Sequence, residues 1–577
     1  MRKNRIPYKR EFMDYKKLIA AKLKIEGVSE SEVYSLIVTP PDTTLGDYAL
    51  PCFKFAKIMR KSPAVIAEDL AANFSTDEVI TKVVAVNGYL NFTVNRTAFT
   101  KAAVEEILLK GDKYGSSNIG AGKTVCIDYS SINIAKPFHI GHLSTTVIGG
   151  ALYRIFNFLG YKAVGINHLG DYGTQFGKLI YAYKTWGDKE AVEKGKIREL
   201  MRLYVKFHEE AEKDSSLDDK AREYFKLIEQ GDKECVELFK WFKDLTLKDV
   251  NKVYDELGVK FDSYAGESFY NDKMEPIIKE LDEKGLLKES NGAKIVDLEP
   301  YGMPPCLILR SDGASLYATR DLAAAVYRKN TYDFYKCLYV VAYQQNLHFK
   351  QLFKVLELMG KPWAKDMVHV AFGMVSLEDG TMSTRKGKVL FLEDVIAKCN
   401  EKAYSIINAK NPDLENKEEV AKAVGTGAVI FGALINSRIK DIVFSYDKAL
   451  NFDGETGPYC QYTYARAASV LAKAGLDKEG AEFKFTATEL SPVEYDLVSV
   501  LSNFPAVVMA AADKYEPSLV TRYAVDLAAA FNKFYFDCKI LGAEEDVRNF
   551  RLALTKATKT TLKNALSLLG IKTPEKM

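Results

Sequence analysis

Short apolar runs that alternate with helical patterns constrain the fold of this chain more than any other sequence feature. Runs typical of buried strands occupy residues 124–129, 163–166, 337–342 and 368–372. Apolar residues recur at helical spacing over 143–159 and 347–359. This alternation predicts an open parallel sheet with crossover helices. Such sheets bind ligands beyond the carboxyl ends of their strands, so we expect functional residues there.

The pattern changes on either side of this alternation and inside it. An Asn87-Gly88 turn joins two strand patterns near the start, residues of about 190–300 look like a charged helical insertion, and strand signals fade after 396. We therefore expect an α/β multidomain chain. Its parts are an N-terminal α+β domain over 1–118, a Rossmann-like parallel-sheet domain with the helical insertion over 119–395, a helical linker over 396–455 and an all-α domain over 456–577.

The composition disfavours several classes of protein. The chain has 577 residues, 47% of them hydrophobic and 27% charged, and no apolar run reaches the ~20 residues that span a bilayer. Its eight cysteines are scattered without a C-x-x-C pair, which disfavours a zinc ribbon or a disulfide framework and suits a reducing compartment. We expect a cytoplasmic protein with no membrane partner and no protein-bound zinc.

One local patch could contact a nucleic acid. The net charge is only +3, but residues 548–577 carry seven basic residues and one acidic residue. Five of the basic residues fall on one side of a helix: Arg548, Arg551, Lys556, Lys559 and Lys563. The alternative interpretation is an ordinary solvated helix face.

Two of the six histidines give the first indication of chemistry. His139 and His142 stand at the predicted join of a strand and a helix. Gly141 lets a flat ligand approach the backbone, and the N-terminus of the following helix attracts an anion. Two imidazoles there can donate hydrogen bonds to phosphate oxygens as charge develops, which predicts nucleotidyl transfer from ATP. The alternative is a pair of capping or core histidines.

Longer blocks around these histidines resemble the arginyl-tRNA synthetases of class I. The blocks are NIAKPFHIGHL (133–143), NHLGDYGTQF (167–176), LYATRDL (316–322) and QQNLH (344–348), with GDYA (46–49) and TGPYCQY (456–462) extending the match along the chain. The resemblance implies activation of L-arginine by ATP with Mg²⁺ and its transfer to the 3′ end of tRNA(Arg), by a monomer that requires bound tRNA for activation. It also implies that the N-terminal domain contacts the tRNA elbow, that 396–455 contacts its stem and that the all-α domain binds the anticodon.

The second family signature, K-M-S-K-S, is altered. The matching segment is TMSTRKG (381–387), in which threonine replaces both lysines. The resemblance assigns ATP binding to Met382, Ser383, Arg385 and Lys386, and we expect Lys136, helped by Arg385 and Lys386, to supply the missing positive charge. A solvated loop lysine is the alternative for Lys136. Two further departures are Ser144, where the family usually has arginine, and Ile132, where proline is common.

A planar guanidinium with five donors is matched by carboxylates that accept two hydrogen bonds at once. The resemblance implies that Asp321 faces it, with Tyr317 nearby and Asp128 as a second anion. The amino and carboxylate end would be held by Gln345, Asn133, Ser131 and His142. The alternative is that Tyr317 and Asp321 form a structural cap and a salt bridge with Arg320.

Two further residue sets follow from the resemblance. The adenylate or the tRNA 3′ end would be lined by His168, Asp171, Gly173 and Gln175. The anticodon would be contacted by Tyr462, Tyr535 and Met577, although core packing is an equal alternative for these three.

Three other functions stay open at this point. A class I synthetase for another amino acid would be revealed by pyrophosphate exchange with a panel of amino acids. A small-metabolite adenylyltransferase shares H-x-G-H but does not need the helical end of the chain. A synthetase-like protein that holds RNA without charging it is favoured only by the altered second signature.

Overall fold

The computed structural model describes residues 15–40, 42, 44–134, 136–311, 317–377, 390–478, 480–486 and 490–577. The chain divides into two compact units. The first comprises Met1–Tyr114, Val470–Ser502 and Ala530–Thr561, and the second comprises Gly115–Ser469, Asn503–Ala529 and Leu562–Met577.

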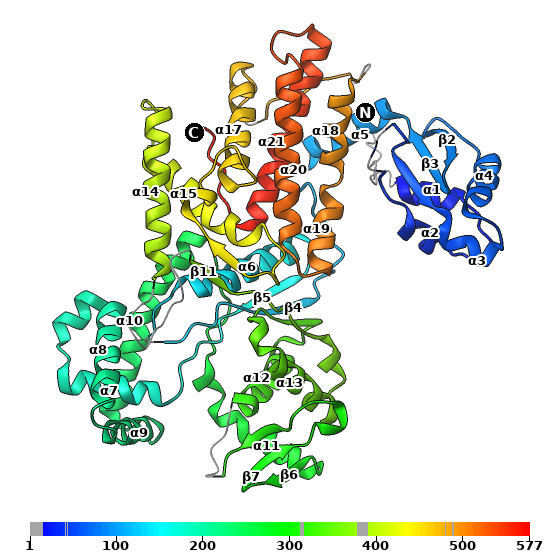
Figure 1. Ribbon diagram of the computed structural model, residues 1–577. Coiled ribbons are helices and arrows are strands. Elements are labelled where there is room, and N and C mark those ends of the chain that lie inside the picture. The colour runs from blue at the N-terminus through cyan, green and yellow to red at the C-terminus, as the bar shows by residue number, and fades with distance from the viewer. Residues whose placement is uncertain are drawn as a thin grey trace, which may run out of the picture. The chain divides into compact units, whose positions relative to one another are not determined.

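The N-terminal part of the first unit is a mixed α+β structure (Figure 1). Its elements are α1 (Tyr15–Lys22), α2 (Glu30–Leu36), β1 (Tyr48–Pro51), α3 (Ala56–Met59), α4 (Pro63–Asn73), β2 (Ile80–Val86), β3 (Tyr89–Val94) and α5 (Arg96–Lys110). The three strands pair antiparallel in the order β1-β3-β2. The predicted hairpin is present because Asn87 (φ 49°) and Gly88 (φ 80°) adopt the left-handed conformation that a tight turn needs.

This part is tied to helices from the end of the chain within the same unit. Asp47 has a side chain that is 4% exposed. It accepts hydrogen bonds from the Val94 N–H (2.8 Å), from Arg96 Nε (3.1 Å) and from the Tyr495 hydroxyl (2.8 Å). Tyr495 lies on α18 (Pro492–Ser502), which packs against α5. A carboxylate buried this deeply is stable only because all three donors reach it.

Four parallel strands form the central sheet of the second unit in the order β10-β9-β4-β5. They are β4 (Thr124–Asp128), β5 (Lys162–Ile166), β9 (Lys336–Tyr339) and β10 (Met367–His369). All four predicted strands are confirmed, with ends that shift by one to three residues. After β5 the chain returns to the other side of β4, so the switch point between β4 and β9 opens a crevice at their carboxyl ends.

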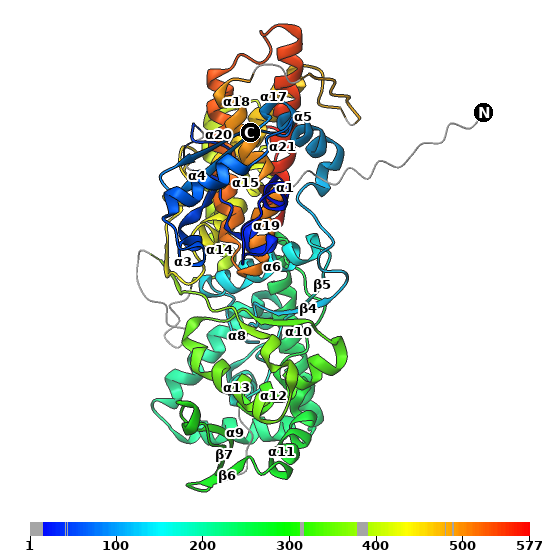
Figure 2. The same ribbon diagram turned by 90° about the vertical axis from the view of Figure 1, so that its right-hand side faces the viewer.

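Helices cover both faces of this sheet. In both ribbon views α6 (Leu143–Phe158) lies on one side of β4 and β5, and α12 (Tyr317–Tyr332) and α13 (Asn346–Leu358) lie on the other (Figures 1 and 2). Gly149 lets α6 approach closely, because a Cβ there would stand 2.2 Å from the Tyr129 ring. On the other face α11 (Met274–Glu283), α12 and α13 bury a continuous apolar core against the strands.

The interruption of the parallel sheet is only partly helical. Four helices form what we call the helical insertion: α7 (Thr174–Trp186), α8 (Lys189–Ala211), α9 (Ser216–Glu229) and α10 (Lys233–Leu257). Three antiparallel strands follow at β6 (Leu287–Ser290), β7 (Ala293–Val296) and β8 (Cys306–Leu309). The 190–300 region is mostly helical, as expected, but its last part also contains the strands β6 and β7. The strands are short and half-exposed, and Asn291 (φ 51°) and Gly292 (φ 77°) form a turn between the first two.

Helices dominate after residue 391. They are α14 (Leu392–Lys410), α15 (Lys417–Leu434), α16 (Tyr446–Ala449), α17 (Gly457–Lys473), α18, α19 (Phe504–Asp513), α20 (Ser518–Asp537) and α21 (Glu545–Leu569). The sequence analysis missed β12 (Ile442–Phe444), which pairs in parallel with β11 (Val375–Leu377). The predicted basic patch lies on α21, but Arg551 Nε binds Glu494 at 2.7 Å, so this member serves an internal ion pair.

Two sequence-wide expectations can be compared with the structure. All eight cysteines are free and buried. One stretch of the described residues, Pro492–Asp513, is apolar enough by length and composition to cross a bilayer. Asn503 divides it into α18 and α19, and 44% of its most apolar window is buried in protein.

Candidate active site

The loop that follows β4 forms one wall of the crevice. Ser130 (φ 67°) and Ser131 (φ 44°) both adopt the left-handed conformation that non-glycine residues rarely adopt. Hydrogen bonds hold them there: the Ser130 N–H donates to Thr145 on α6 (2.9 Å), and the Ser131 hydroxyl donates to Asp128 (2.6 Å). Strain of this kind is maintained only where the surroundings impose it, which is common at functional sites.

The two signature histidines lie at the N-terminus of α6, as the sequence predicts. Their ring centroids are 4.1 Å apart. Nδ1 of His139 accepts from the Gly141 N–H (3.0 Å), and Nδ1 of His142 accepts from the His139 N–H (3.3 Å). Each Nδ1 is an acceptor, so each Nε2 carries the proton and can donate to a ligand.

Burial keeps both rings neutral. It lowers the pKa of His139 to about 4. It lowers the pKa of His142 to about 3, with a further contribution from the neighbouring His139. Two neutral donors can therefore meet phosphate oxygens without a fixed positive charge of their own. The fixed charge nearby is that of Lys136, which lies close enough to lower the pKa of His142.

Asp321 lies on α12 in a polar cluster. Its Oδ2 is 2.7 Å from Nε2 of His348, and its Oδ1 is 3.8 Å from Nε2 of His168. Burial alone raises the pKa of Asp321, but the bond to His348 and nearby positive charge outweigh burial and hold this pKa below its ordinary value. Asp321 is therefore ionised and 28% exposed, and it can accept a cationic ligand.

A second carboxylate, Glu267, shares this environment and was missed by sequence reasoning. Its Oε2 is 3.4 Å from Nη1 of Arg320, whose guanidinium lies 4.4 Å above the Tyr172 ring. Burial raises the pKa of Glu267 to about 7; Arg320 opposes this shift, and Asp321 and Asp171 add to it. No periodic pattern marks Glu267 in the sequence, because only the fold brings it next to α12.

Asp128 serves an internal ion pair. Its Oδ2 is 2.7 Å from Nη2 of Arg328, whose side chain is 1% exposed, and its Oδ1 accepts from Ser131. Arg328 also reaches Nδ1 of His168 at 3.3 Å. This differs from the expectation that Asp128 supplies the second anion for a substrate, since its side chain is only 7% exposed and its two oxygens bind Arg328 at 2.7 Å and Ser131 at 2.6 Å. The alternative salt bridge between Asp321 and Arg320 is also replaced, because Arg320 binds Glu267.

The remaining residues assigned to the amino-acid site stand at the same end of the sheet. Asn133 pairs with Gly170 in an isolated bridge, where a Cβ on Gly170 would stand 2.2 Å from Asn133 Oδ1. Gln345 is exposed in a 3₁₀ turn after β9. Tyr317 begins α12 with 67% of its surface exposed.

The residues after β5 that were assigned to the adenylate or the tRNA 3′ end make more internal contacts than expected. The Asp171 carboxylate binds Lys243 of α10 (2.6 Å) and the N–H and hydroxyl of Ser268 (2.9 and 2.8 Å). Gly173 (φ 123°) begins α7, and Gln175 Nε2 donates to the Gly170 carbonyl (3.4 Å). His168 stacks on Tyr270, with ring centroids 5.5 Å apart. Asp171 therefore anchors the helical insertion to the sheet.

The residues assigned to the second signature, Met382, Ser383, Arg385 and Lys386, lie outside the described residues. Of the residues assigned to the anticodon, Tyr462 is 41% exposed on α17 beneath the Arg466 guanidinium at 5.0 Å. Tyr535, in the other unit, is 43% exposed on α20. The Met577 carbonyl accepts from Asn411 (3.3 Å).

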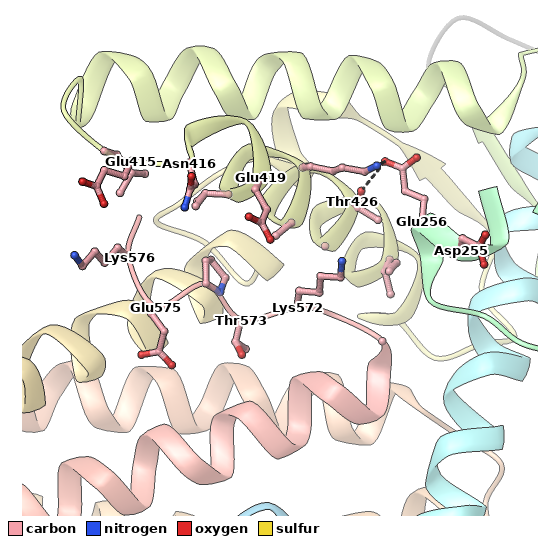
Figure 3. A pocket seen from close by; sticks show the side chains of 18 of the residues that line it. Asp255, Glu256, Glu415, Asn416, Glu419, Thr426, Lys572, Thr573, Glu575 and Lys576 are labelled. Carbon is pink, nitrogen blue, oxygen red and sulfur yellow. Dashed lines mark hydrogen bonds and ion pairs between the residues drawn. The ribbon is translucent and has the colours of Figure 1, made fainter. Parts of the chain in front are cut away.

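The C-terminal tail that ends in Met577 lines a cavity of about 620 Å³ with α15 (Figure 3). Acidic and basic side chains both line it, including Glu256, Glu419, Lys572 and Lys576. Glu256 Oε1 accepts from Asn400 (3.0 Å) and from Thr426 (3.3 Å). This cavity is built from elements other than the sheet and histidine signature.

Comparison with known proteins gives matches along the whole chain. Residues 103–446 match the model described as tRNA synthetases class I (R), catalytic domain; residues 460–577 match the DALR anticodon binding domain; and residues 13–94 match the arginyl tRNA synthetase N terminal domain. The arginine–tRNA ligase of Halothermothrix orenii is 56% identical over 96% of this chain and 98% of its own. That of Clostridioides difficile is 54% identical, with the same shares covered. The solved arginyl-tRNA synthetase of Thermus thermophilus covers 94% of this chain and 96% of its own, with 27% identity and a TM-score of 0.81.

Proposed function

This chain belongs to the arginyl-tRNA synthetase family of class I, and from that premise we propose how its residues divide the reaction. The enzyme activates arginine with ATP and transfers it to tRNA. The arginine carboxylate attacks the α-phosphate of Mg-ATP and releases pyrophosphate. A hydroxyl of the terminal ribose of tRNA then attacks the acyl carbon of the adenylate, takes the arginyl group and releases AMP. No side chain needs to act as a nucleophile, so positioning and charge stabilisation carry the rate.

The ATP half of the site consists of His139, Gly141, His142 and Lys136. The observation that carries this assignment is the pair of neutral imidazoles, each with Nδ1 occupied and Nε2 available as a donor. Lys136 supplies the cation that the altered second signature lacks, and its effect on the pKa of His142 supports its proximity. Met382, Ser383, Arg385 and Lys386 stay assigned to ATP by resemblance alone.

The arginine half consists of Asp321 and Glu267, with Tyr317, Gln345, Asn133 and Ser131 around them. Asp321 is ionised in the free enzyme. A guanidinium entering the site would pair with Asp321 and lower the pKa of Glu267, which the free site holds at about 7. A carboxylate that accepts two hydrogen bonds at once selects a guanidinium over a lysine ammonium. Asp128 with Arg328 supports the wall of the site and does not bind substrate directly.

Charging of total tRNA with labelled arginine tests the function. We expect arginine to be attached and the other amino acids to be rejected. Asp321→Ala removes the ionised partner of the substrate cation, so charging should fall about 100-fold or more. Asp282→Ala, on the exposed side of α11, is the matched control and should charge at the wild-type rate. Equal loss in both variants would contradict the assignment of Asp321.

The remaining assignments follow the same division. His168, Gly173 and Gln175 adjoin the adenylate or the tRNA 3′ end, and Tyr462, Tyr535 and Met577 contact the anticodon. The family matches support the proposed N-terminal, catalytic and anticodon-binding domains. We place the enzyme in the cytoplasm, as a monomer. Size-exclusion chromatography with light scattering measures its molar mass and so tests the monomeric state.

A further inference from the structure

A single arginine of the helical insertion reaches the segment that leads into α14. The guanidinium of Arg198, on α8, lies 4.2 Å from the centre of the Phe391 ring. Its Nη2 donates to Glu393 Oε1 (2.6 Å) and to Asp394 Oδ1 (2.8 Å), both in the first turn of α14. One side chain thus contacts three of the four residues from 391 to 394.

That segment is paired with the histidine signature. The Leu392 N–H donates to the Phe138 carbonyl (2.9 Å), and the Ile140 N–H donates to the Leu390 carbonyl (3.3 Å). These two bonds form an antiparallel bridge in which Phe391 stands opposite His139. The residues on either side of His139 are therefore bonded to the residues on either side of Phe391, on which Arg198 stacks, and the His139 N–H is bonded within the turn that leads into α6.

The base of Arg198 is itself fixed. The path of α8 breaks at Lys196 (φ 46°), whose ammonium binds Asp249 of α10 at 3.1 Å. Beyond the break, Ile197 and Leu200 are buried in the helical insertion. Arg198 belongs to this anchored stretch of α8, so a movement of the helical insertion would also move the Arg198 side chain.

We propose that Arg198 is a positioning residue for His139, through Phe391, and that it couples the helical insertion to the activation of arginine. This inference rests on the ATP role proposed above for His139. A purely structural role would be small, because Arg198, Glu393 and Asp394 have side chains that are 49%, 42% and 48% exposed, and exposed pairs contribute little to stability. The planar guanidinium can stack and bind two carboxylates at once, which an ammonium cannot do.

Arginine-dependent pyrophosphate exchange, with tRNA present, tests the proposal in purified full-length variants. Arg198→Ala should lower kcat roughly tenfold, because a small displacement of a group that acts in the transition state is costly. The KM for arginine and the melting temperature should stay at wild-type values. Arg198→Lys should recover only part of the rate. Arg202→Ala is the matched control, since Arg202 lies one turn later on α8 and its guanidinium binds Glu199 of the same helix.

A second set of variants separates a positioning role from a local defect. Glu393→Gln with Asp394→Asn should reproduce part of the loss, and combining them with Arg198→Ala should add little, because the residues act together. A histidine ¹³C NMR titration gives an independent readout: the pKa of His139 should rise toward its ordinary value in Arg198→Ala and stay unchanged in Arg202→Ala.

Three outcomes overturn the inference. A wild-type kcat in Arg198→Ala shows that the contact has no role in activation. A melting temperature that falls in step with kcat shows a structural role alone. His139→Asn, measured beside Arg198→Ala, separates the ATP role of His139 from the positioning role of Arg198. If His139→Asn activates arginine at the wild-type rate, the ATP role of His139 fails and the inference falls with it. If His139→Asn loses activity and Arg198→Ala does not, only the inference is overturned.

Discussion

At the scale of single residues, the site depends on which groups are charged before substrate arrives. His139 and His142 are neutral donors, Asp321 is ionised, and Glu267 is close to half-ionised at neutral pH because its pKa is about 7. The positive charge of Lys136 lowers the pKa of His142, so Lys136 is a cation that acts on this pair of imidazoles. Each of these states can be tested.

The raised pKa of Glu267 predicts a pH dependence of arginine binding. The carboxylate that attracts a guanidinium is the form present above pH 7, so the KM for arginine should fall as pH rises from about 6 to 8. Asp321, with a lowered pKa, stays ionised across this range. Glu267→Gln should raise the KM and flatten its dependence on pH. A pH dependence that persists unchanged in this variant would assign the titration to another group.

Replacement of Lys136 tests the compensation for the altered second signature. Lys136→Met should lower kcat for arginine activation about 100-fold, because a cation near the triphosphate stabilises charge that develops in the transition state. The KM for arginine should change little. The control is Lys350→Met, at an exposed position of α13. Unchanged turnover in Lys136→Met would mean that the compensation lies elsewhere.

At the scale of elements, close packing of α6 on the loop after β4 keeps the histidines against the sheet. Gly149→Ala would place a methyl group 2.2 Å from the Tyr129 ring, so it should destabilise the protein by about 1–3 kcal/mol and lower the melting temperature. Gly432→Ala makes the same change within α15, where the nearest atom is 3.7 Å away, and should raise stability by about 0.5–1 kcal/mol. Differential scanning calorimetry measures both, and equal shifts would argue against the close contact.

The elements that the sequence predicts well are those with strong periodicity. The four parallel strands and the helices α6 and α13 follow from apolar spacing, since burial against the sheet requires apolar side chains. The strands β6 and β7 and the β11–β12 pair were missed because they are short and partly exposed, so no apolar run marks them. The site was predicted where motifs are contiguous, as at His139–His142. It could not be predicted where partners come from distant segments, as with Glu267 and with Arg328 beside Asp128.

At the scale of the whole molecule, segments distant in the sequence share one unit. Asp47 and Tyr495 are 448 positions apart and are hydrogen-bonded, so the first part of the chain does not form its unit alone. The sequence predicted domains that are consecutive stretches of the chain, whereas the first compact unit combines residues 1–114 with 470–502 and 530–561.

Loss of the Asp47 charge should loosen that unit. Asp47→Asn leaves Arg96 without its carboxylate and weakens the bond from Tyr495, at a cost of about 2–3 kcal/mol. Hydrogen exchange should quicken in β3, α5 and α18 together. Asp42→Asn, an exposed change nearby, should leave exchange unaltered. Faster exchange in β3 alone would show that α18 holds its place by other contacts.

Because all eight thiols are buried, the native protein should react very little with alkylating dyes. Burial also raises the pKa of several of them, so the reactive thiolate is scarce while the fold is intact. A cysteine introduced on the exposed face of α8 would then take a fluorophore at one place only, without removal of any native cysteine. The same protein would report its own unfolding, as the number of dye molecules bound rises from one to nine.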